Sequence, residues 1–234
     1  MAFEDQFQEQ HIAGGGKIRS IILGFNDGLI SVFTLLIGVA TATYLSTGDN
    51  FVVVLTGFAA MVSGAFSMGL GEYISSKSEA KYIQNEIERE NAEIELFPDE
   101  EKMEVSTIFK DMGFEGELLD AAVEKITSDK ETWKDFLVSS ELGLEEPESP
   151  VIGAILTFFS FLFGAFISIF PYLLDLGIIS LILSSLISFS MLFIAGSLKT
   201  KITGESPWKS GIEMVIVGFV AFIASYLIGI YLEP

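Results

Sequence analysis

Residues 51–76 read FVVVLTGFAAMVSGAFSMGLGEYISS, and the charged stretch KSEAKYIQNEIERENAEIEL follows at once as residues 77–96. The first stretch has one charged residue, Glu72, in 26 positions, and as a helix it is long enough to cross a ~30 Å hydrocarbon layer. No proline interrupts the chain from Phe51 to Phe97, so we expect one helix to leave the membrane and continue into the charged region. The sequence therefore predicts an all-α membrane protein.

Five stretches are apolar enough to span a membrane, and the acidic residues are concentrated between the second and the third. The predicted spans are 18–45, 51–76, 151–174, 178–198 and 207–232. They divide the chain into a tail (1–17), spans one and two (18–77), an acidic domain (78–148) and spans three to five (149–234).

Charge and composition narrow the function further. The chain has 32 acidic and 13 basic residues but a mean hydropathy of +0.52, and residues 78–148 alone hold 22 of the acids and 7 of the bases. This charge balance excludes nucleic acid as a partner and favours cations. Because there is no cysteine, disulfides, thiolate metal sites and cysteine nucleophiles are excluded as well.

The basic residues predict the orientation in the membrane. All 13 fall on one side of the predicted spans, whereas the opposite loops and the C-terminus contain only the acids Asp49, Asp175 and Glu233. The excess of lysine and arginine in cytoplasmic loops places the N-terminus and the acidic domain in the cytoplasm.

Within the acidic domain, apolar residues recur at helical spacing and predict a helical bundle. Pro98-Asp99 should separate the first helix from the second, and Met112-Gly113 should end the second. Ser128 and Glu131 have the capping-box spacing and are expected to start the last helix. In the fourth span, Ser180, Ser184 and Ser188 are expected to form a close-packing face.

A series of possible metal ligands follows one face of the long second helix. Its members are separated by 4, 7, 7, 4 and 3 residues: Met68, Glu72, Glu79, Glu86, Glu90 and Glu93. Carboxylates this close repel one another unless cations lie between them, which favours a metal-binding face. A solvated acidic surface is the alternative, and the spacing alone does not decide between the two.

Asp27 lies about ten residues into the first span, where an ionised carboxylate costs roughly 2.5–3.5 kcal/mol. It begins a polar and small-residue stripe with Ser31, Thr34, Gly38 and Thr41. A hydrated pathway would explain both the carboxylate and the stripe, whereas close helix packing would explain only the small residues. The sequence contains no catalytic constellation, which makes a membrane enzyme the weakest hypothesis.

Several motifs resemble the vacuolar iron transporter family. They are Asn26-Asp27-Gly28-Leu29, residues 64–73 (GAFSMGLGEY), residues 77–80 (KSEA), the stretch from Glu90 to Asp99, and Phe136 with residues 141–145 (ELGLE). The order of five spans with an insert after the second is similar too, and together these features extend over about four-fifths of the chain.

The resemblance implies a homodimeric exchanger that moves ferrous iron, and sometimes manganese, out of the cytosol against protons. Zinc and cobalt are further candidate metals. A three-helix cytoplasmic metal-binding domain inserted between spans two and three is implied as well. The metal ligands implied there are Glu90, Glu93, Glu101, Glu104 and Glu141. The resemblance also implies Glu79, at the cytoplasmic end of span two, and the helix pattern adds Glu86. The implied transport pathway contains Asp27, Met68, Glu72 and Lys77.

One departure from the family concerns metal preference. Plant members have two adjacent methionines before the last glutamate, where this chain has Leu137 and Val138. Loss of these soft ligands leaves hard oxygen and weakens any preference for iron over manganese.

A membrane-anchored metal sensor or buffer without a transport pathway is the alternative function, although it leaves Asp27 unexplained. A prokaryotic protein would lie in the cell membrane, which the short tails favour, and a eukaryotic one in the vacuolar membrane.

Overall fold

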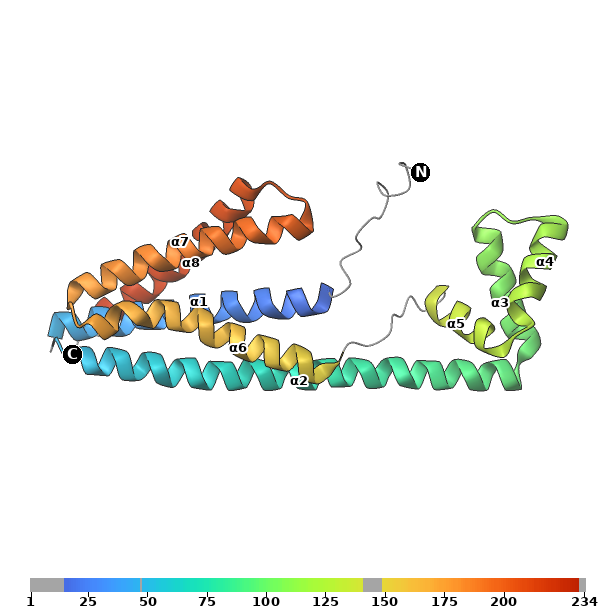
Figure 1. Cartoon of the computed structure of the whole chain (residues 1–234), viewed down its shortest axis with the longest axis horizontal. Coiled ribbons are helices and arrows are strands. Elements are labelled where there is room, and N and C mark those ends of the chain that lie inside the picture. Colours follow the sequence, from blue (N-terminus) through green and yellow to red (C-terminus); the bar gives the residue numbers. More distant parts are fainter. Residues whose placement is uncertain (1–14, 47, 141–148, 232–234) are drawn as a thin grey trace, which may run out of the picture. The chain divides into compact units, whose positions relative to one another are not determined.

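The structure is a computed structural model that describes residues 15–46, 48–140 and 149–231 (Figure 1). Within these ranges every regular element is a helix. The α-helices are α1 (Gly15–Ser46), α2 (Asn50–Leu96), α3 (Pro98–Asp111), α4 (Gly116–Thr127), α5 (Lys130–Ser140), α6 (Pro150–Ile169), α7 (Ile178–Thr203) and α8 (Pro207–Tyr231), and a 3-10 helix, η2 (Phe170–Leu174), follows α6. The all-α prediction is confirmed.

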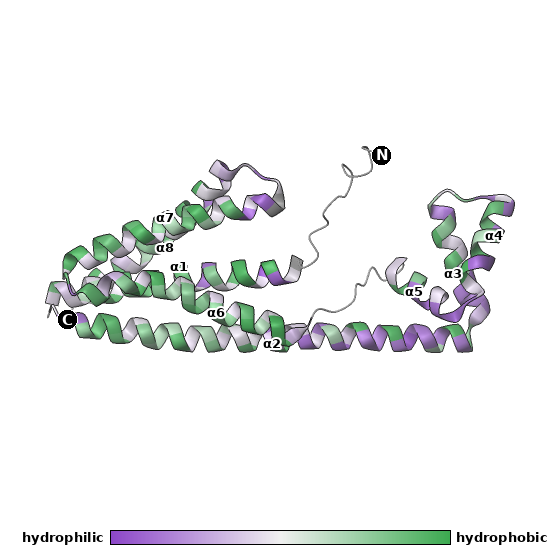
Figure 2. Ribbon diagram, in the orientation of Figure 1, coloured by the Kyte–Doolittle hydropathy of each residue, from purple (hydrophilic) through white to green (hydrophobic). Residues whose placement is uncertain are grey.

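Five helical segments are long and apolar enough to cross a membrane, as predicted. They are Gly16–Ser46, Asn50–Leu96, Pro150–Leu174, Ile178–Lys201 and Pro207–Tyr231. The second belongs to α2, an uninterrupted helix of 47 residues whose first half is mainly hydrophobic and whose second half is mainly hydrophilic (Figure 2). The expected passage from span to charged helix is therefore observed, because no proline breaks the backbone hydrogen bonds.

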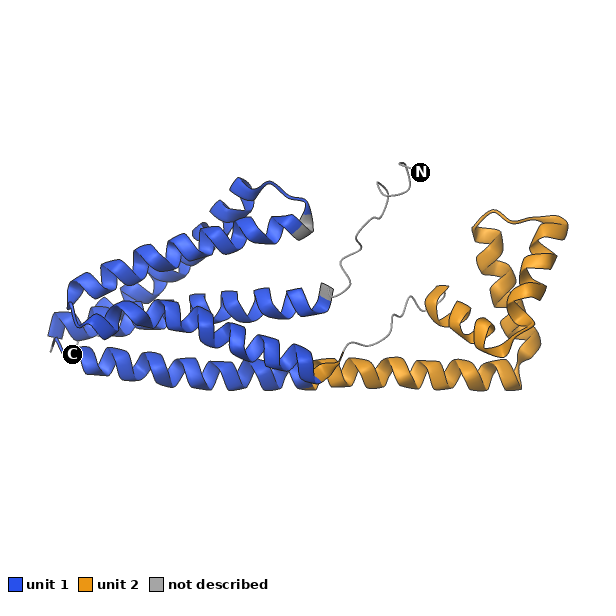
Figure 3. Ribbon diagram, in the orientation of Figure 1, with its two compact units in different colours: residues 1–73, 151–234 blue, residues 74–150 orange. Residues whose placement is uncertain are grey.

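The chain divides into two compact units (Figure 3). Unit 1 comprises residues 1–73 and 151–234, and unit 2 comprises residues 74–150, so that α2 contributes to both. The predicted acidic segment, 78–148, falls within unit 2. The predicted tail lies outside the described residues except for its last three positions.

In unit 1, α1 is the central helix. Half of its most apolar window is buried, compared with a third or less for the other four spans. Its fully buried side chains include Leu29, Phe33, Leu36 and Ile37. Phe33, Leu36 and Ile37 pack with residues of α2, α6, η2 and α7 in a single apolar cluster.

Glycines bring α1 and α6 into backbone contact. A Cβ atom on Gly28 would lie 2.2 Å from the carbonyl oxygen of Phe161, and a Cβ atom on Gly164 would lie 2.3 Å from the carbonyl oxygen of Phe25. Neither position can hold a larger residue unless the helices separate. Such small-residue contacts replace the hydrophobic effect as the means of holding helices together in lipid.

The predicted packing face of α7 is buried against α6. Ser180, Ser184 and Ser188 have no exposed surface, and the Ser184 hydroxyl donates a 2.8 Å hydrogen bond to the carbonyl oxygen of Ser168. Ser168 and Ser188 Oγ lie 3.3 Å apart. These contacts support close packing as the role of the serines.

Unit 2 contains the hydrophilic half of α2 with α3, α4 and α5 around a small core of Ile94, Val105, Trp133 and Leu137. The predicted helix breaks are observed. Pro98 is the first residue of α3, and Gly113, two residues after α3 ends, has a φ of 93°. Few residues other than glycine adopt that conformation.

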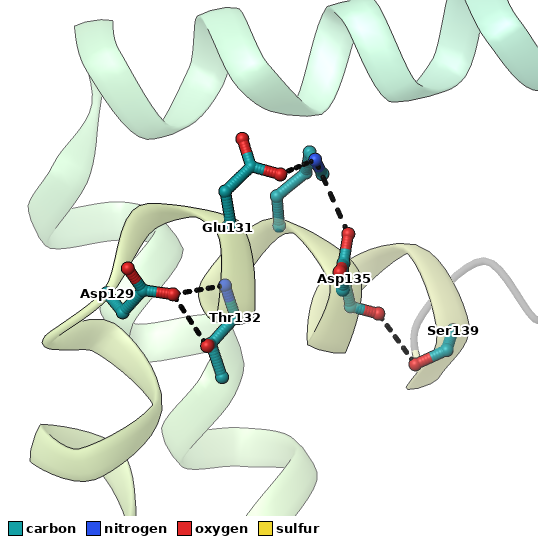
Figure 4. A network of polar contacts seen from close by, with 6 residues as sticks. Asp129, Glu131, Thr132, Asp135 and Ser139 are labelled. Atoms are coloured by element: carbon teal, nitrogen blue, oxygen red, sulfur yellow. Dashed lines mark hydrogen bonds and ion pairs between the residues drawn. The ribbon is translucent and has the colours of Figure 1, made fainter.

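The predicted cap of the last helix is wrong by one residue (Figure 4). Asp129, and not Ser128, accepts hydrogen bonds from the Thr132 amide at 2.9 Å and from its hydroxyl at 2.7 Å. These bonds lower the pKa of the Asp129 carboxyl. The Ser128 hydroxyl donates instead to the carbonyl oxygen of Lys125 at the end of α4.

Glu131, the second residue of the predicted capping box, pairs with Lys134 of α5. The Lys134 ammonium lies 2.5 Å from a carboxylate oxygen of Glu131 and 3.4 Å from one of Asp135. The hydrogen bond to Glu131 raises the pKa of Lys134. The Glu131 carboxylate is therefore engaged with Lys134, one turn later in α5, and not with the Ser128 backbone.

Candidate functional site

Asp27 occupies the thirteenth position of α1, within the span and half-buried in the single chain. The hydroxyl of Ser31, one turn further along, donates a 2.9 Å hydrogen bond to Asp27 Oδ1. Ser31 is exposed and Thr34 is half-buried, and the Thr34 hydroxyl donates to the Ile30 carbonyl oxygen at 2.8 Å. The first three residues of the predicted stripe, Asp27, Ser31 and Thr34, therefore lie on an outer face of unit 1.

The last two residues of the same stripe, Gly38 and Thr41, pack against α8. Gly38 lies against α8, where an added Cβ would be 3.2 Å from the carbonyl oxygen of Ser225. Thr41 is buried, and its Cβ lies 2.9 Å from the position that a Cβ on Gly229 would take. Close packing thus accounts for Gly38 and Thr41, but it does not account for Asp27 and Ser31.

Glu72 lies where three helices of unit 1 meet. The hydroxyl of Ser20 in α1 donates a 3.1 Å hydrogen bond to Glu72 Oε1. Gly153 of α6 leaves room for the carboxylate, because a Cβ there would be 3.2 Å from Oε1 and 3.5 Å from Ser20 Oγ. Thr157, one turn further along α6, donates to the Ser20 carbonyl oxygen at 3.4 Å. Glu72 is therefore held by α1 within a space that α6 leaves open.

Ser20 also relates Glu72 to Asp27. The two α1 residues are seven positions apart, which corresponds to two turns and about 10 Å along the helix axis. Met68, one turn before Glu72 on α2, is half-buried and packs against the apolar cluster of unit 1. The predicted pathway residues Asp27, Met68 and Glu72 thus belong to one helical bundle, whereas Lys77 belongs to unit 2 and is exposed.

In unit 2 two of the predicted ligands point inward. Glu90 and Glu101 are each 5% exposed. Each precedes a core residue by one turn, Ile94 on α2 and Val105 on α3, and those two residues belong to the same cluster. Carboxylate oxygens are ligands that suit hard divalent cations. Glu90 and Glu101 are therefore the predicted ligands that lie nearest the core of unit 2.

The other predicted ligands lie nearer the surface. Glu86 and Glu93 are half-buried, and Glu79 and Glu104 are exposed. Glu93 accepts a 3.1 Å hydrogen bond from the Arg89 guanidinium. Glu141 lies outside the described residues. Across the ranges that the structure does describe, no group of three or more acidic or histidine side chains is arranged to hold a metal ion.

Sequence reasoning missed Ser20 and Gly153. Neither carries a local signal, because a serine and a glycine at the ends of spans are ordinary packing residues. They become part of the site only through the tertiary contact of α1, α2 and α6.

At the other end of unit 1 a polar clamp joins α1, α2 and η2. The Tyr44 hydroxyl donates a 2.7 Å hydrogen bond to Asn50 Oδ1, and Asn50 Nδ2 donates a 2.8 Å bond to the Tyr172 carbonyl oxygen. Beside this clamp is an open cavity of about 510 Å³ whose lining includes Asp49 and Asp175. The two loop acids of this side, Asp49 and Asp175, therefore face one opening.

Known proteins resemble this chain along almost its whole length. The family model of the VIT family matches residues 18–230. Vacuolar iron transporter 1 of Arabidopsis thaliana is 33% identical over 225 residues, which cover 95% of this chain and 88% of the relative. Protein CCC1 of Saccharomyces cerevisiae is also 33% identical, over 89% of this chain and 67% of its own length. The vacuolar iron transporter of Plasmodium berghei is 30% identical over 98% of this chain and 87% of its own length.

These matches extend through all five spans and unit 2, and they confirm the resemblance drawn from the sequence motifs. On this evidence of sequence and architecture, the chain belongs to the VIT family of vacuolar iron transporters and their relatives.

Proposed function

We propose that this chain transports ferrous iron across a membrane in exchange for protons. The plant and protozoan relatives are named as iron transporters, which supports iron as the substrate. Manganese is the second substrate we infer. Leu137, which replaces one of the two family methionines, is fully buried in the apolar core of unit 2, so this position contributes no soft ligand.

The observation that carries the proposal is the presence of two carboxylates, Asp27 and Glu72, on spanning helices of unit 1. Ser20, which bonds to Glu72, lies about two helical turns before Asp27 on α1. The two carboxylates are therefore separated by about two turns along the direction of that helix. A carboxylate binds a divalent cation when ionised and releases it when protonated. Two such groups in series therefore offer both a path for the metal and a means of coupling it to protons.

A second copy of the chain is the partner we infer. Asp27 is half-buried and Ser31 exposed in the single chain, and a lipid-facing carboxylate within a span would be unfavourable. A homodimer that covers this face of α1 would provide the missing wall of the pathway. Unit 2, on the cytoplasmic side in the topology that the basic residues predict, would then collect metal with Glu79, Glu86, Glu90, Glu93, Glu101, Glu104 and Glu141.

Metal flux into proteoliposomes under an imposed pH gradient tests the proposal. We expect wild-type protein to take up Fe²⁺ and Mn²⁺ and to move protons in the opposite direction. Asp27→Asn should lower the flux at least tenfold, because the amide keeps the shape of the side chain but cannot be ionised. Glu213→Gln, an equivalent change at an exposed carboxylate of α8, serves as the control and should leave the flux near that of the wild type.

The alternative, a membrane-anchored metal sensor or buffer, has one observation in its favour. Unit 2 has its own apolar core and two buried carboxylates, so metal binding there does not require a pathway. Metal binding without any flux in the proteoliposomes would favour this alternative. Flux that persists in Asp27→Asn would contradict the assignment of the pathway.

A further inference from the structure

Between α1 and α7 of unit 1 lies a groove that the transport proposal does not use. It is a cavity of about 370 Å³ whose lining residues are apolar except for Asn26 and Lys199. Ile18, Ile22 and Phe25 line it from α1, and Ile194, Leu198 and Lys199 line it from α7. We refer to it as the α1–α7 groove. The lining residues of α7 extend from Met191 to Lys199, eight positions or about 12 Å along the helix.

The groove lies at one end of an otherwise closed interface. Further along the same two helices, the rings of Phe33 and Phe189 meet at 5.4 Å. There α1 also touches α8, where an added Cβ on Gly229 would lie 2.5 Å from the Gly38 carbonyl oxygen. Large side chains take the place of such contacts from Ile18 to Phe25, and a space remains between the helices.

One basic residue lines the groove, and others lie close to its lining residues in the sequence of α1 and α7. Lys199 is half-buried in its lining, and among the described residues neither an ion pair nor a hydrogen bond engages its ammonium. Lys17 and Arg19 at the start of α1 and Lys201 near the end of α7 are exposed. These four are four of the five basic residues of unit 1. An occupant that reaches Lys199 should therefore carry a negative charge.

The size of the groove limits what can fill it. Its walls belong to spanning helices, so only lipid or another helix can enter from the side. A helix about 10 Å across and 12 Å long occupies roughly 1,000 Å³, more than twice the available volume. A single acyl chain is thinner and meets the apolar walls without leaving backbone polar groups in contact with them.

We propose that the α1–α7 groove binds an acyl chain of an anionic phospholipid and that the Lys199 ammonium holds the phosphate. Basic pockets between spanning helices on the side rich in lysine and arginine are suited to such head groups. The chain is bound by the apolar stripes of α1 and α7, and the charge selects the head group.

Native mass spectrometry of the full chain in detergent tests this proposal with phosphatidylglycerol and phosphatidylcholine of identical acyl chains. The wild type should bind phosphatidylglycerol about fivefold more tightly than phosphatidylcholine. Lys199→Ala should remove that preference. Lys209→Ala removes the same charge from α8, outside the groove, and should preserve the preference. Equal binding of the two lipids by the wild type, or equal losses in the two variants, would overturn the proposal.

The acyl chain has its own test. Ala195 lines the groove, and Ala195→Phe should fill it and abolish the binding of both lipids without a change in charge. Ser190→Phe adds the same ring at an exposed position of α7 and should bind lipid like the wild type. Ala195→Leu replaces the larger substitution if gel filtration shows that Ala195→Phe aggregates.

Glycerol 3-phosphate provides the last arm. It should fail to displace phosphatidylglycerol, because it lacks the acyl chain. Full displacement would mean that the site takes phosphate alone and would overturn the lipid assignment. Every readout here is binding and not flux, so the result is independent of the proposed transport activity.

Discussion

The hydroxyl of Ser20 donates a 3.1 Å hydrogen bond to Oε1 of Glu72, a residue 52 positions later in the chain. This bond joins α1 to α2 at the level where α6 leaves a gap at Gly153. Hydrogen bonds to charged groups contribute about 1.5–3 kcal/mol, enough to fix the direction of a carboxylate. Ser20 is therefore a positioning residue for Glu72.

We predict that Ser20→Ala lowers metal flux about tenfold, the rate equivalent of roughly 1.4 kcal/mol. Alanine keeps the helix but no longer directs the Glu72 carboxylate. The measurement is Fe²⁺ uptake into proteoliposomes, with Ser20→Thr as the variant that keeps the hydroxyl and should recover most of the activity. Equal flux in Ser20→Ala and in the wild type would show that Glu72 needs no such support.

A second prediction concerns the gap beside Glu72. Gly153→Leu places atoms where the carboxylate now lies, since even a Cβ would be only 3.2 Å from Oε1. Flux should fall at least as far as in Ser20→Ala. Gly71→Leu is the matched control, because nothing lies within 4 Å of a Cβ added there. A loss of the same size in both variants would attribute the effect to the added side chain itself and not to Glu72.

The buried carboxylates of unit 2 lead to a third prediction. A ligand that binds only the folded state stabilises it by RT ln(1 + [L]/Kd), so about 2.7 kcal/mol is expected at a hundredfold excess over Kd. Mn²⁺ should therefore raise the unfolding midpoint of unit 2, and Glu90→Gln with Glu101→Gln should abolish that shift. Glu117→Gln, an exposed glutamate of α4, should keep it.

Fluorescence of Trp133 provides the measurement, because this side chain is part of the core of unit 2. The chain has two tryptophans, so a Trp208→Phe background makes the signal specific to unit 2. A Mn²⁺ shift that survives in the double variant would place the metal elsewhere.

The cap of α5 gives a prediction of pH dependence. Hydrogen bonds from Thr132 lower the pKa of Asp129, so the ionised carboxylate stabilises the folded state above its unfolded pKa of about 3.9. That contribution is lost as the pH falls through the folded pKa. Asp129→Ala should therefore lower the unfolding midpoint at pH 7, and the difference from the wild type should shrink below about pH 4.

Ser128→Ala distinguishes this cap from the one that the sequence spacing suggested. Its hydroxyl donates to the Lys125 carbonyl at the end of α4 and not to the start of α5, so the same Trp133 assay should find little change at any pH. A larger loss of unfolding midpoint in Ser128→Ala than in Asp129→Ala would show that Ser128 is the cap after all.

The spans and the helix breaks could be predicted because their signals are local. Hydropathy over 20 residues identifies a span, and Pro98 and Gly113 act on the backbone around them. Asp129 shows the limit of such reasoning. Ser128 and Asp129 are both good caps, and a shift of one residue in the start of a helix decides between them.

The candidate site depended less on local pattern. Asp27 could be identified because a carboxylate in an apolar span needs an explanation, and Glu90 because its helical spacing is regular. The contact of Ser20 with Glu72, and the burial of Glu101 next to Val105, arise when separate helices pack, and neighbouring residues in the sequence do not encode them. The burial of Glu90, among the predicted ligands on α2, likewise depends on how α2 packs against the other helices of unit 2.

The paired glycine contacts of α1 and α6 have a mechanical consequence. With Gly28 against the Phe161 carbonyl and Gly164 against that of Phe25, the two backbones interlock from both sides. If either helix rotated, a residue with a side chain would take the place of a glycine and collide with the facing backbone. A transport cycle in this fold should therefore carry α1 and α6 as one rigid body, and the hinges should be sought in the helices that meet this pair through deformable side chains.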